Sequence, residues 1–187
     1  MKHIVGLLTF FVALAVCGDM VQAQPTGKTW KIGVLVSSTA SINAARDEAM
    51  RQGLRELGYE EGKNIVIDYK YAEGKTDRLP QLAKELVAEK PDVIVVGGTA
   101  VAVAAKNATS TIPIVMAQDT DPVGNGFVAS LARPGGNITG LSTLAPEISG
   151  KQLELLKEIV PKLSRVAVLG TSTNPGNAQS LRETELA

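Results

Sequence analysis

Three short polar segments of this chain follow apolar runs, at places where side chains could bind a small charged molecule. The segments are Ser37-Ser38-Thr39, Gly97-Gly98-Thr99 and Gln118-Asp119-Thr120-Asp121. The first two precede expected helices, whose free N–H groups and positive dipole ends attract an anion. Asp119 or Asp121 could accept a charge-assisted hydrogen bond from an ammonium group. Because open α/β sheets hold ligands at the carboxyl ends of their strands, these segments form the candidate binding site.

Some of these residues also have purely structural interpretations. Thr99 and Ser41 could cap the helices that begin beside them. Asp121 and Pro122 could set up an Asx-type turn. Gly98 allows close approach of a ligand to the backbone, where the Thr99 hydroxyl could add a hydrogen bond. The sequence leaves both interpretations open for Thr99 and for Asp121.

Alternating strands and helices are expected to position these loops. Apolar runs predict strands at 31–36, 65–71, 93–96 and 114–117. Apolar residues at helical spacing predict helices over about 42–57, 77–89 and 100–108. The order β-α-β-α-β-α-β has right-handed parallel crossovers as its natural solution. We therefore expect residues 31 to about 120 to form an α/β lobe, a doubly wound parallel sheet with helices on both faces.

Two of these helices have an apolar stripe that is expected to face the core. In the helix over 42–57 the stripe consists of Ile42, Ala45, Ala49, Gly53, Leu54 and Leu57. In the helix over 77–89 it consists of Leu79, Leu82, Ala83, Leu86 and Val87. Both stripes follow the spacing of three and four residues that places side chains on one helix face.

A Gly/Pro-rich passage at 133–137 is suited to carry the chain from one lobe to another. An extended run at 138–142 follows it, and the pattern then restarts with an expected helix over 148–160 and strand over 165–169. We expect residues 31–142 to form a first lobe including the crossover, and residues 143–187 to begin a second, incomplete α/β lobe. The second part is too short for an independent core. The expectation is a fragment or a prematurely ended gene product.

Residues 1–23 have the features of a cleaved signal peptide. A short positive start and an apolar run of thirteen residues precede small residues suited to signal peptidase at 21–23. The run is too short to span a bilayer, which takes about 20 residues. Lipid attachment at Cys17, as in a lipoprotein, is an alternative. Lipoprotein processing sites usually have a small residue just before the cysteine, and Val16 is not small. Cleavage after Ala23, giving a soluble periplasmic protein, is favoured.

Composition argues against catalysis and against nucleic-acid binding. Cleavage would remove His3 and Cys17, the only histidine and the only cysteine. The remaining chain lacks the residues for zinc sites of the His/Cys kind and for Ser-His-Asp or Cys-His catalysis. No Gly-x-Gly-x-x-Gly opens a helix. Nineteen basic residues balance nineteen acidic ones, so the charge of a nucleic-acid binder is missing. We expect no enzyme, no cofactor and no metal.

Residues 112–142 closely resemble the substrate-binding proteins of ABC transporters of the tryptophan/tyrosine type. The apolar strand at 114–117, the acidic turn at 119–122 and the Gly/Pro passage carry the resemblance, which covers nearly all of residues 31–187. It implies a periplasmic-binding-protein-like clamshell that captures a small molecule between two lobes and delivers it to a membrane permease. Aromatic or branched amino acids are the ligands it suggests. The same fold would also suit a periplasmic sensing module for a membrane receptor.

The resemblance also implies roles for individual residues. It favours Asp121 as the ammonium acceptor, because Asp-Pro-Val matches the family, and a ligand carboxylate would suit the helix N-termini after Ser37, Ser38 and Gly98. It implies Asn174 as a contact from the second lobe. Relatives often have Asn-Pro directly after the strand there, where this chain has Thr171-Ser172, so the later Asn174 fits better.

Overall fold

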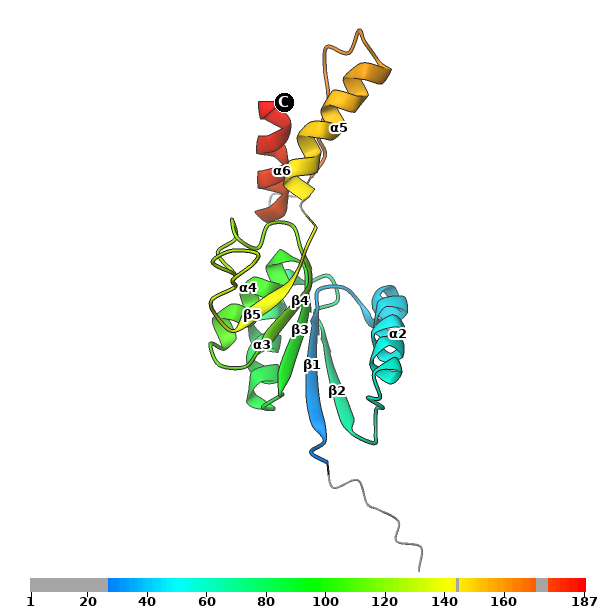
Figure 1. Cartoon of the computed structure of the whole chain (residues 1–187), viewed down its shortest axis with the longest axis vertical. Helices are drawn as coiled ribbons and strands as arrows, with labels where there is room; N and C mark the ends of the chain where they lie inside the picture. Colours follow the sequence, from blue (N-terminus) through cyan, green and yellow to red (C-terminus); the bar gives the residue numbers. More distant parts are fainter. Residues whose placement is uncertain (1–26, 144, 171–174) are drawn as a thin grey trace, which may run out of the picture.

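The computed structural model describes residues 27–143, 145–170 and 175–187 (Figure 1). Its central element is a sheet of five parallel strands in the order β2-β1-β3-β4-β5. The strands are β1 (Trp30–Val36), β2 (Ile65–Tyr71), β3 (Val93–Gly97), β4 (Ile114–Asp119) and β5 (Ile138–Ser142). Their carboxyl ends all lie at one edge, where the candidate loops were expected.

Helices cover both faces of this sheet. Helix α2 (Ala40–Glu56) lies on one face, and α3 (Leu79–Ala88) and α4 (Thr99–Ala108) lie on the other (Figure 1). A 3-10 turn, η1 (Thr76–Arg78), leads into α3. The expected doubly wound α/β lobe is therefore confirmed, and the predicted strands and helices lie within three residues of the observed ones.

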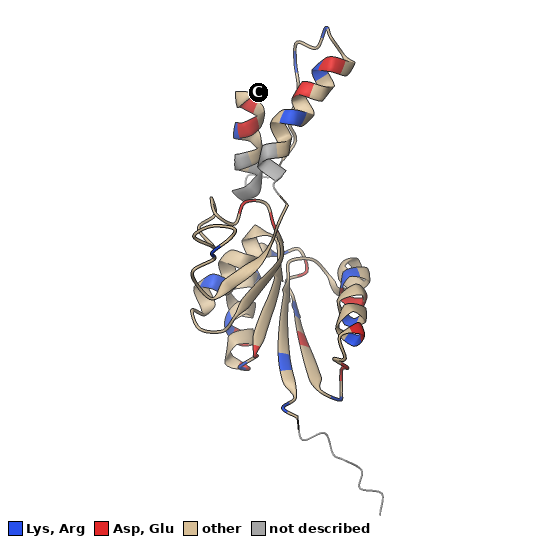
Figure 2. Ribbon diagram, viewed as in Figure 1, with Lys and Arg blue, Asp and Glu red and all other residues tan. Residues whose placement is uncertain are grey.

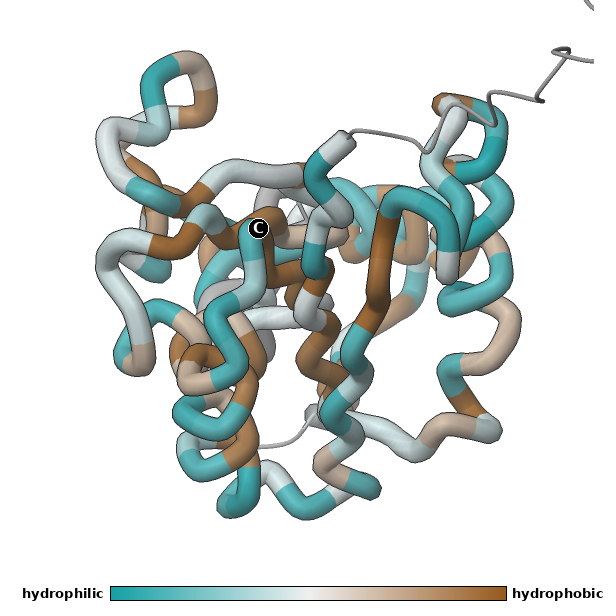
Figure 3. The backbone as a smooth tube through the Cα atoms, turned by 90° about the horizontal axis from the view of Figure 1, so that it is seen from below, coloured by the Kyte–Doolittle hydropathy of each residue, from teal (hydrophilic) through white to brown (hydrophobic). Residues whose placement is uncertain are grey.

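The larger core lies between the sheet and the pair α3 and α4. The predicted stripe of α3 is confirmed, since Leu79, Leu82, Ala83 and Leu86 are buried. A Cβ added to Gly33 of β1 would meet the Leu86 side chain at 2.9–3.0 Å, so α3 packs directly on the strand. In Figure 3 many hydrophobic segments lie toward the centre of the view, and hydrophilic segments are common in the outer turns.

The predicted apolar stripe of α2 is wrong for most of its members. Ile42 is 68% exposed and Leu57 is 76% exposed, while Met50 and Leu54 pack on the sheet. Asp47 takes the most buried position of this helix, at 5% exposure. Its carboxylate accepts hydrogen bonds from the Tyr71 hydroxyl at 2.7 Å and from the Asn43 side-chain amide. Hydrogen bonds that satisfy a buried carboxylate, rather than apolar periodicity, orient α2.

Beyond the sheet, α5 (Ala145–Ile159) and α6 (Pro175–Leu186) pack against each other (Figure 1). The expected strand over 165–169 is not formed, because no described strand lies beside it to complete a ladder. The signal peptide predicted at 1–23 lies outside the described residues. Among the residues that are described, none belongs to a helix long and apolar enough to cross a membrane.

Candidate functional site

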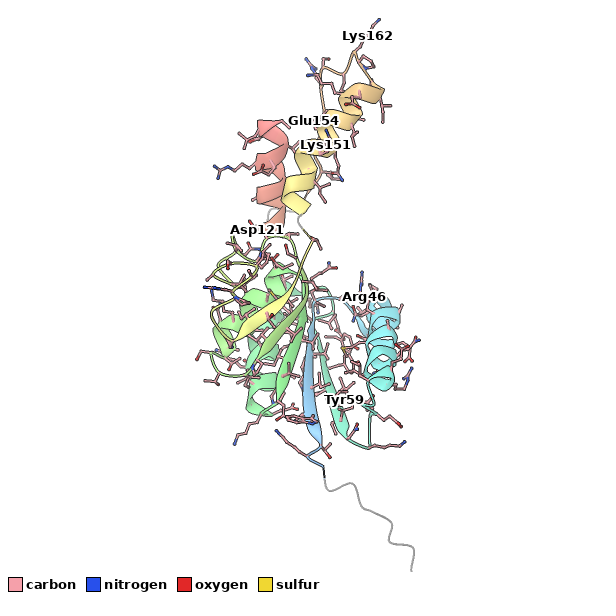
Figure 4. All side chains as sticks on the ribbon, viewed as in Figure 1. Arg46, Tyr59, Asp121, Lys151, Glu154 and Lys162 are labelled. Atoms are coloured by element: carbon pink, nitrogen blue, oxygen red, sulfur yellow. The ribbon has the colours of Figure 1, made fainter. Side chains whose placement is uncertain are left out.

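The predicted site residues of the first lobe all lie at the carboxyl edge of the sheet. Ser37 and Ser38 follow β1, Gly98 and Thr99 link β3 to α4, and Asp119 is the last residue of β4. Figure 4 shows Asp121 at this edge, on the side from which the chain continues to α5, with Tyr59 at the opposite end. Asn174 lies outside the described residues, so its role stays a prediction.

Asp119 is the most enclosed charged group at this edge. It is 1% exposed, and its carboxylate accepts three hydrogen bonds. The Thr99 hydroxyl donates to Oδ2 at 2.9 Å, and the Asp121 backbone N–H and the Asn125 side-chain amide donate to Oδ1 at 3.0 and 2.9 Å. These donors replace the water that burial removes. Thr99 thus bonds to Asp119 and does not cap α4, so its capping interpretation is wrong.

The N-terminus of α4 follows two glycines, Gly97 and Gly98. Gly98 is its N-cap residue, with φ of 88°, a conformation that glycine adopts at low cost. Apart from the adjoining residues of the chain, no atom lies within 4 Å of a Cβ built on Gly97 or Gly98. Within the described residues no side chain caps this helix, so the first turn can offer N–H donors to an anion.

The loop after β1 is held by its backbone. Ser37 and Ser38 are half-buried, and their carbonyl oxygens accept from the N–H groups of Gly74 at 2.7 Å and Glu73 at 3.2 Å. Helix α2 is capped by Thr39, whose hydroxyl accepts from the backbone N–H of residue 42 at 3.3 Å. The cap was predicted at Ser41 instead, which only bonds to the Thr39 hydroxyl.

Asp121 begins a loop that folds back on the lobe. Its Oδ1 accepts a hydrogen bond from the Gly124 N–H at 2.8 Å. Asp121 therefore takes part in a turn, which agrees with its structural interpretation. The Lys106 ammonium group donates to the Gly126 carbonyl oxygen at 2.6 Å and ties the loop to α4. Acidic residues mark this loop in Figure 2. Contact between Asp121 and a ligand stays a prediction.

Sequence reasoning missed two residues of this arrangement, Asn125 and Thr143. Asn125 donates to Asp119, and Thr143 bonds to the Asp119 carbonyl oxygen through its N–H at 2.9 Å and its hydroxyl at 3.3 Å. The register of the sheet shifts between Met116 and Asp119, an irregularity of the kind that redirects side chains at functional edges. The one available signal was that Asn125 follows an acidic turn at a strand end.

Comparison with known proteins identifies relatives of this chain. The tyrosine-binding protein of Clostridioides difficile (strain R20291) is 40% identical over 118 residues, which are 63% of this chain and 34% of that protein. A conserved domain protein from Vibrio cholerae O1 biovar El Tor str. N16961 shares the fold with a TM-score of 0.74 and 41% identity. The match covers 84% of this chain and 52% of that one.

A third relative is the ABC domain from Streptococcus pneumonia, solved in complex with L-Trp. It has a TM-score of 0.71 and 31% identity, again over 84% of this chain and 52% of its own. The chain therefore spans about a third of the curated relative and about half of the solved ones. The family model described as ABC transporter substrate binding protein matches residues 31–187. The chain belongs to the ABC transporter substrate-binding protein family.

Proposed function

We propose that this chain is the solute-capturing part of an ABC transporter, binding a small molecule, with an aromatic amino acid as the first candidate. The observation that carries the proposal is the meeting of three polar loops at one sheet edge in a chain of this family. The names of two relatives, one a tyrosine-binding protein and one solved with L-Trp, support an aromatic amino acid.

The geometry suggests how the two ends of an amino acid would be held. The open N-terminus of α4 at Gly98 can donate N–H groups to a carboxylate. Asp121 can accept from the ammonium group, since its Oδ1 already lies at this edge in a turn. The backbone-held loop at Ser37 and Ser38 would flank the ligand. Asn174 would contact it from the other side.

The proposal extends to organisation and delivery. Residues 31–142 would form the first lobe with the crossover, and residues 143–187 would begin the second. A ligand bridging two lobes stabilises a closed form, which a permease can recognise. No chemical change of the ligand is involved. A signal peptide over residues 1–23, cleaved after Ala23, would direct the protein to the periplasm.

Titration calorimetry tests the binding proposal. The exported chain would be titrated with L-tyrosine, L-tryptophan, L-phenylalanine, L-leucine and glycine, and we expect heat from at least one aromatic amino acid and none from glycine. The absence of binding to every aromatic member would contradict the aromatic assignment. The intact mass of the product released from the periplasm tests export separately, and it should correspond to a chain that begins at Gln24.

A further inference from the structure

Asp119 connects three segments that meet at the candidate site. Through its carboxylate it holds Thr99 at the start of α4 and both Asp121 and Asn125 in the loop after β4. Through its carbonyl oxygen it holds Thr143, one residue after β5 ends. Thr143 directly follows β5 and precedes α5, so it lies where the chain leaves the sheet. A single residue therefore joins the loops of the candidate site to the connection from β5 to α5.

We propose that Asp119 is a positioning residue, which does not itself contact the ligand but couples the loops at Thr99 and Asp121 to the connection from β5 to α5 at Thr143. Its enclosure supports this role, because a carboxylate that is 1% exposed and accepts three hydrogen bonds has little surface left for a ligand. The positioning concerns the free protein. The transmission of ligand binding to Thr143 rests on the function proposed above.

The coupling has a physical basis in the stiffness of residue 119. Its backbone is fixed by ladder pairing with Ser142, and its carboxylate is fixed by three donors in a closely packed environment. Moving the side chain would separate a buried charge from donors that replace its water, which is costly. A displacement of Thr99 or Asp121 therefore strains Asp119 and its pairing with β5, and it also disturbs the carbonyl oxygen that accepts from Thr143.

Amide hydrogen exchange resolved by NMR tests the positioning without any ligand. Asp119→Ala removes the acceptor of the Asp121 amide, whereas the Thr143 amide keeps its backbone acceptor and loses only the side-chain bonds that hold residue 119 in place. We expect the exchange of both amides to quicken roughly tenfold or more. Asp119→Asn keeps Oδ1 as an acceptor and should stay within about threefold of the wild type. Faster exchange at Asp121 with an unchanged Thr143 would reduce Asp119 to a local turn former and overturn the proposal.

A matched control is available at the other edge of the sheet. Asp92 precedes β3 and accepts from the Lys31 backbone N–H at 2.8 Å. Asp92→Ala should leave the exchange rate of the Thr143 amide unchanged. If Asp92→Ala raised this rate as much as Asp119→Ala does, the change would reflect a general loss of stability and would contradict the proposal. Should Asp119→Ala fail to fold, Thr99→Val removes one donor only. It should quicken Thr143 exchange roughly threefold, and no change would overturn the coupling.

Addition of L-tryptophan distinguishes the positioning by Asp119 in the free protein from the transmission of ligand binding to Thr143. Saturation should slow Thr143 exchange in the wild type and leave it unaltered in Asp119→Ala. If the wild type binds L-tryptophan without any change at Thr143, transmission is wrong while the binding function stands. If no aromatic amino acid binds, the binding function and the transmission both fail, and the ligand-free comparison still decides whether Asp119 positions Thr143.

Discussion

Gly140 of β5 lies so close to Met116 of β4 that a Cβ built on Gly140 would come within 2.2 Å of the Met116 carbonyl oxygen. It would also lie 2.7 Å from the Met116 N and Cβ atoms. Gly140 has φ of 148°, in the region that side chains disfavour. Two parallel strands thus approach at a point where only glycine fits, shortly before the chain leaves the sheet for α5.

We expect Gly140→Ala to lower the free energy of unfolding by about 3 kcal/mol, because the added methyl group meets backbone atoms that cannot turn away. Urea denaturation followed by circular dichroism measures this. Gly136→Ala is the matched control, since nothing lies within 4 Å of its Cβ position. Equal stabilities of the two variants would show that β5 can move away from β4.

Tyr71→Phe should destabilise the lobe by about 1–3 kcal/mol, because it removes a donor from the buried Asp47 carboxylate. Burial, and then the hydrogen bond and charge of Asp47, raise the pKa of the Tyr71 phenol, which keeps it a donor at neutral pH. Thermal unfolding gives the change. Tyr59→Phe, at a side chain that is 40% exposed, should be almost neutral. If both variants behaved alike, the Asp47 bond would not hold α2.

The stability of the lobe should depend on Glu89 in acid. A hydrogen bond from Lys70, then the neighbouring Asp68 carboxyl group and a hydrogen bond from Lys31, lower the pKa of Glu89 from 4.5 to about 2. A carboxylate with a lowered folded-state pKa stabilises the protein above its unfolded pKa and loses that contribution as the pH falls from about 4.5 to about 2. The stability difference between wild type and Glu89→Gln should therefore shrink over this window.

Denaturation of both proteins at several pH values measures that difference. High salt screens exposed charges and should reduce it at neutral pH. Asp68 beside Glu89 acts in the opposite direction, because burial and then Glu89 raise its pKa. A difference that stayed constant from pH 5 to about 2 would show that the lysines do not hold Glu89 in solution.

Asp121→Asn should weaken binding of an aromatic amino acid roughly tenfold or more while leaving stability nearly unchanged. The amide oxygen can still accept from Gly124, so the turn remains, and only the charge is lost. Calorimetric titration and thermal unfolding give the two quantities. Asp92→Asn makes the same chemical change at the opposite edge and should bind normally. Unaltered affinity in Asp121→Asn would remove Asp121 from the site.

The order of strands and helices could be predicted because it depends on local periodicity. The stripe of α3 follows from apolar spacing alone, and the structure buries it. The orientation of α2 could not be predicted, because Asp47 is satisfied by Tyr71, which lies 24 positions further along the chain. The sequence shows only an acidic residue in a helix, and it does not show that this residue will be buried and will accept a hydrogen bond from a distant tyrosine.

In the candidate site, too, the location could be predicted from the sequence but the contacts between distant residues could not. Its location followed from the rule that parallel strands share a carboxyl edge. The bond between Thr99 and Asp119 depends on the pairing of β3 with β4, and the bond between Asp119 and Thr143 depends on the register of β4 with β5. Register shifts at both places, so spacing along the sequence could not give these partners.

The segment at 163–170, which forms no regular secondary structure, has a consequence for how the protein behaves at high concentration. Val166 and Val168 are about half exposed and Leu169 is fully exposed, on backbone that no described strand pairs. Such a segment is a template for adding strands from other molecules. Self-association would then begin here, far from the well-packed sheet, and its rate would rise with protein concentration even while the first lobe stays folded.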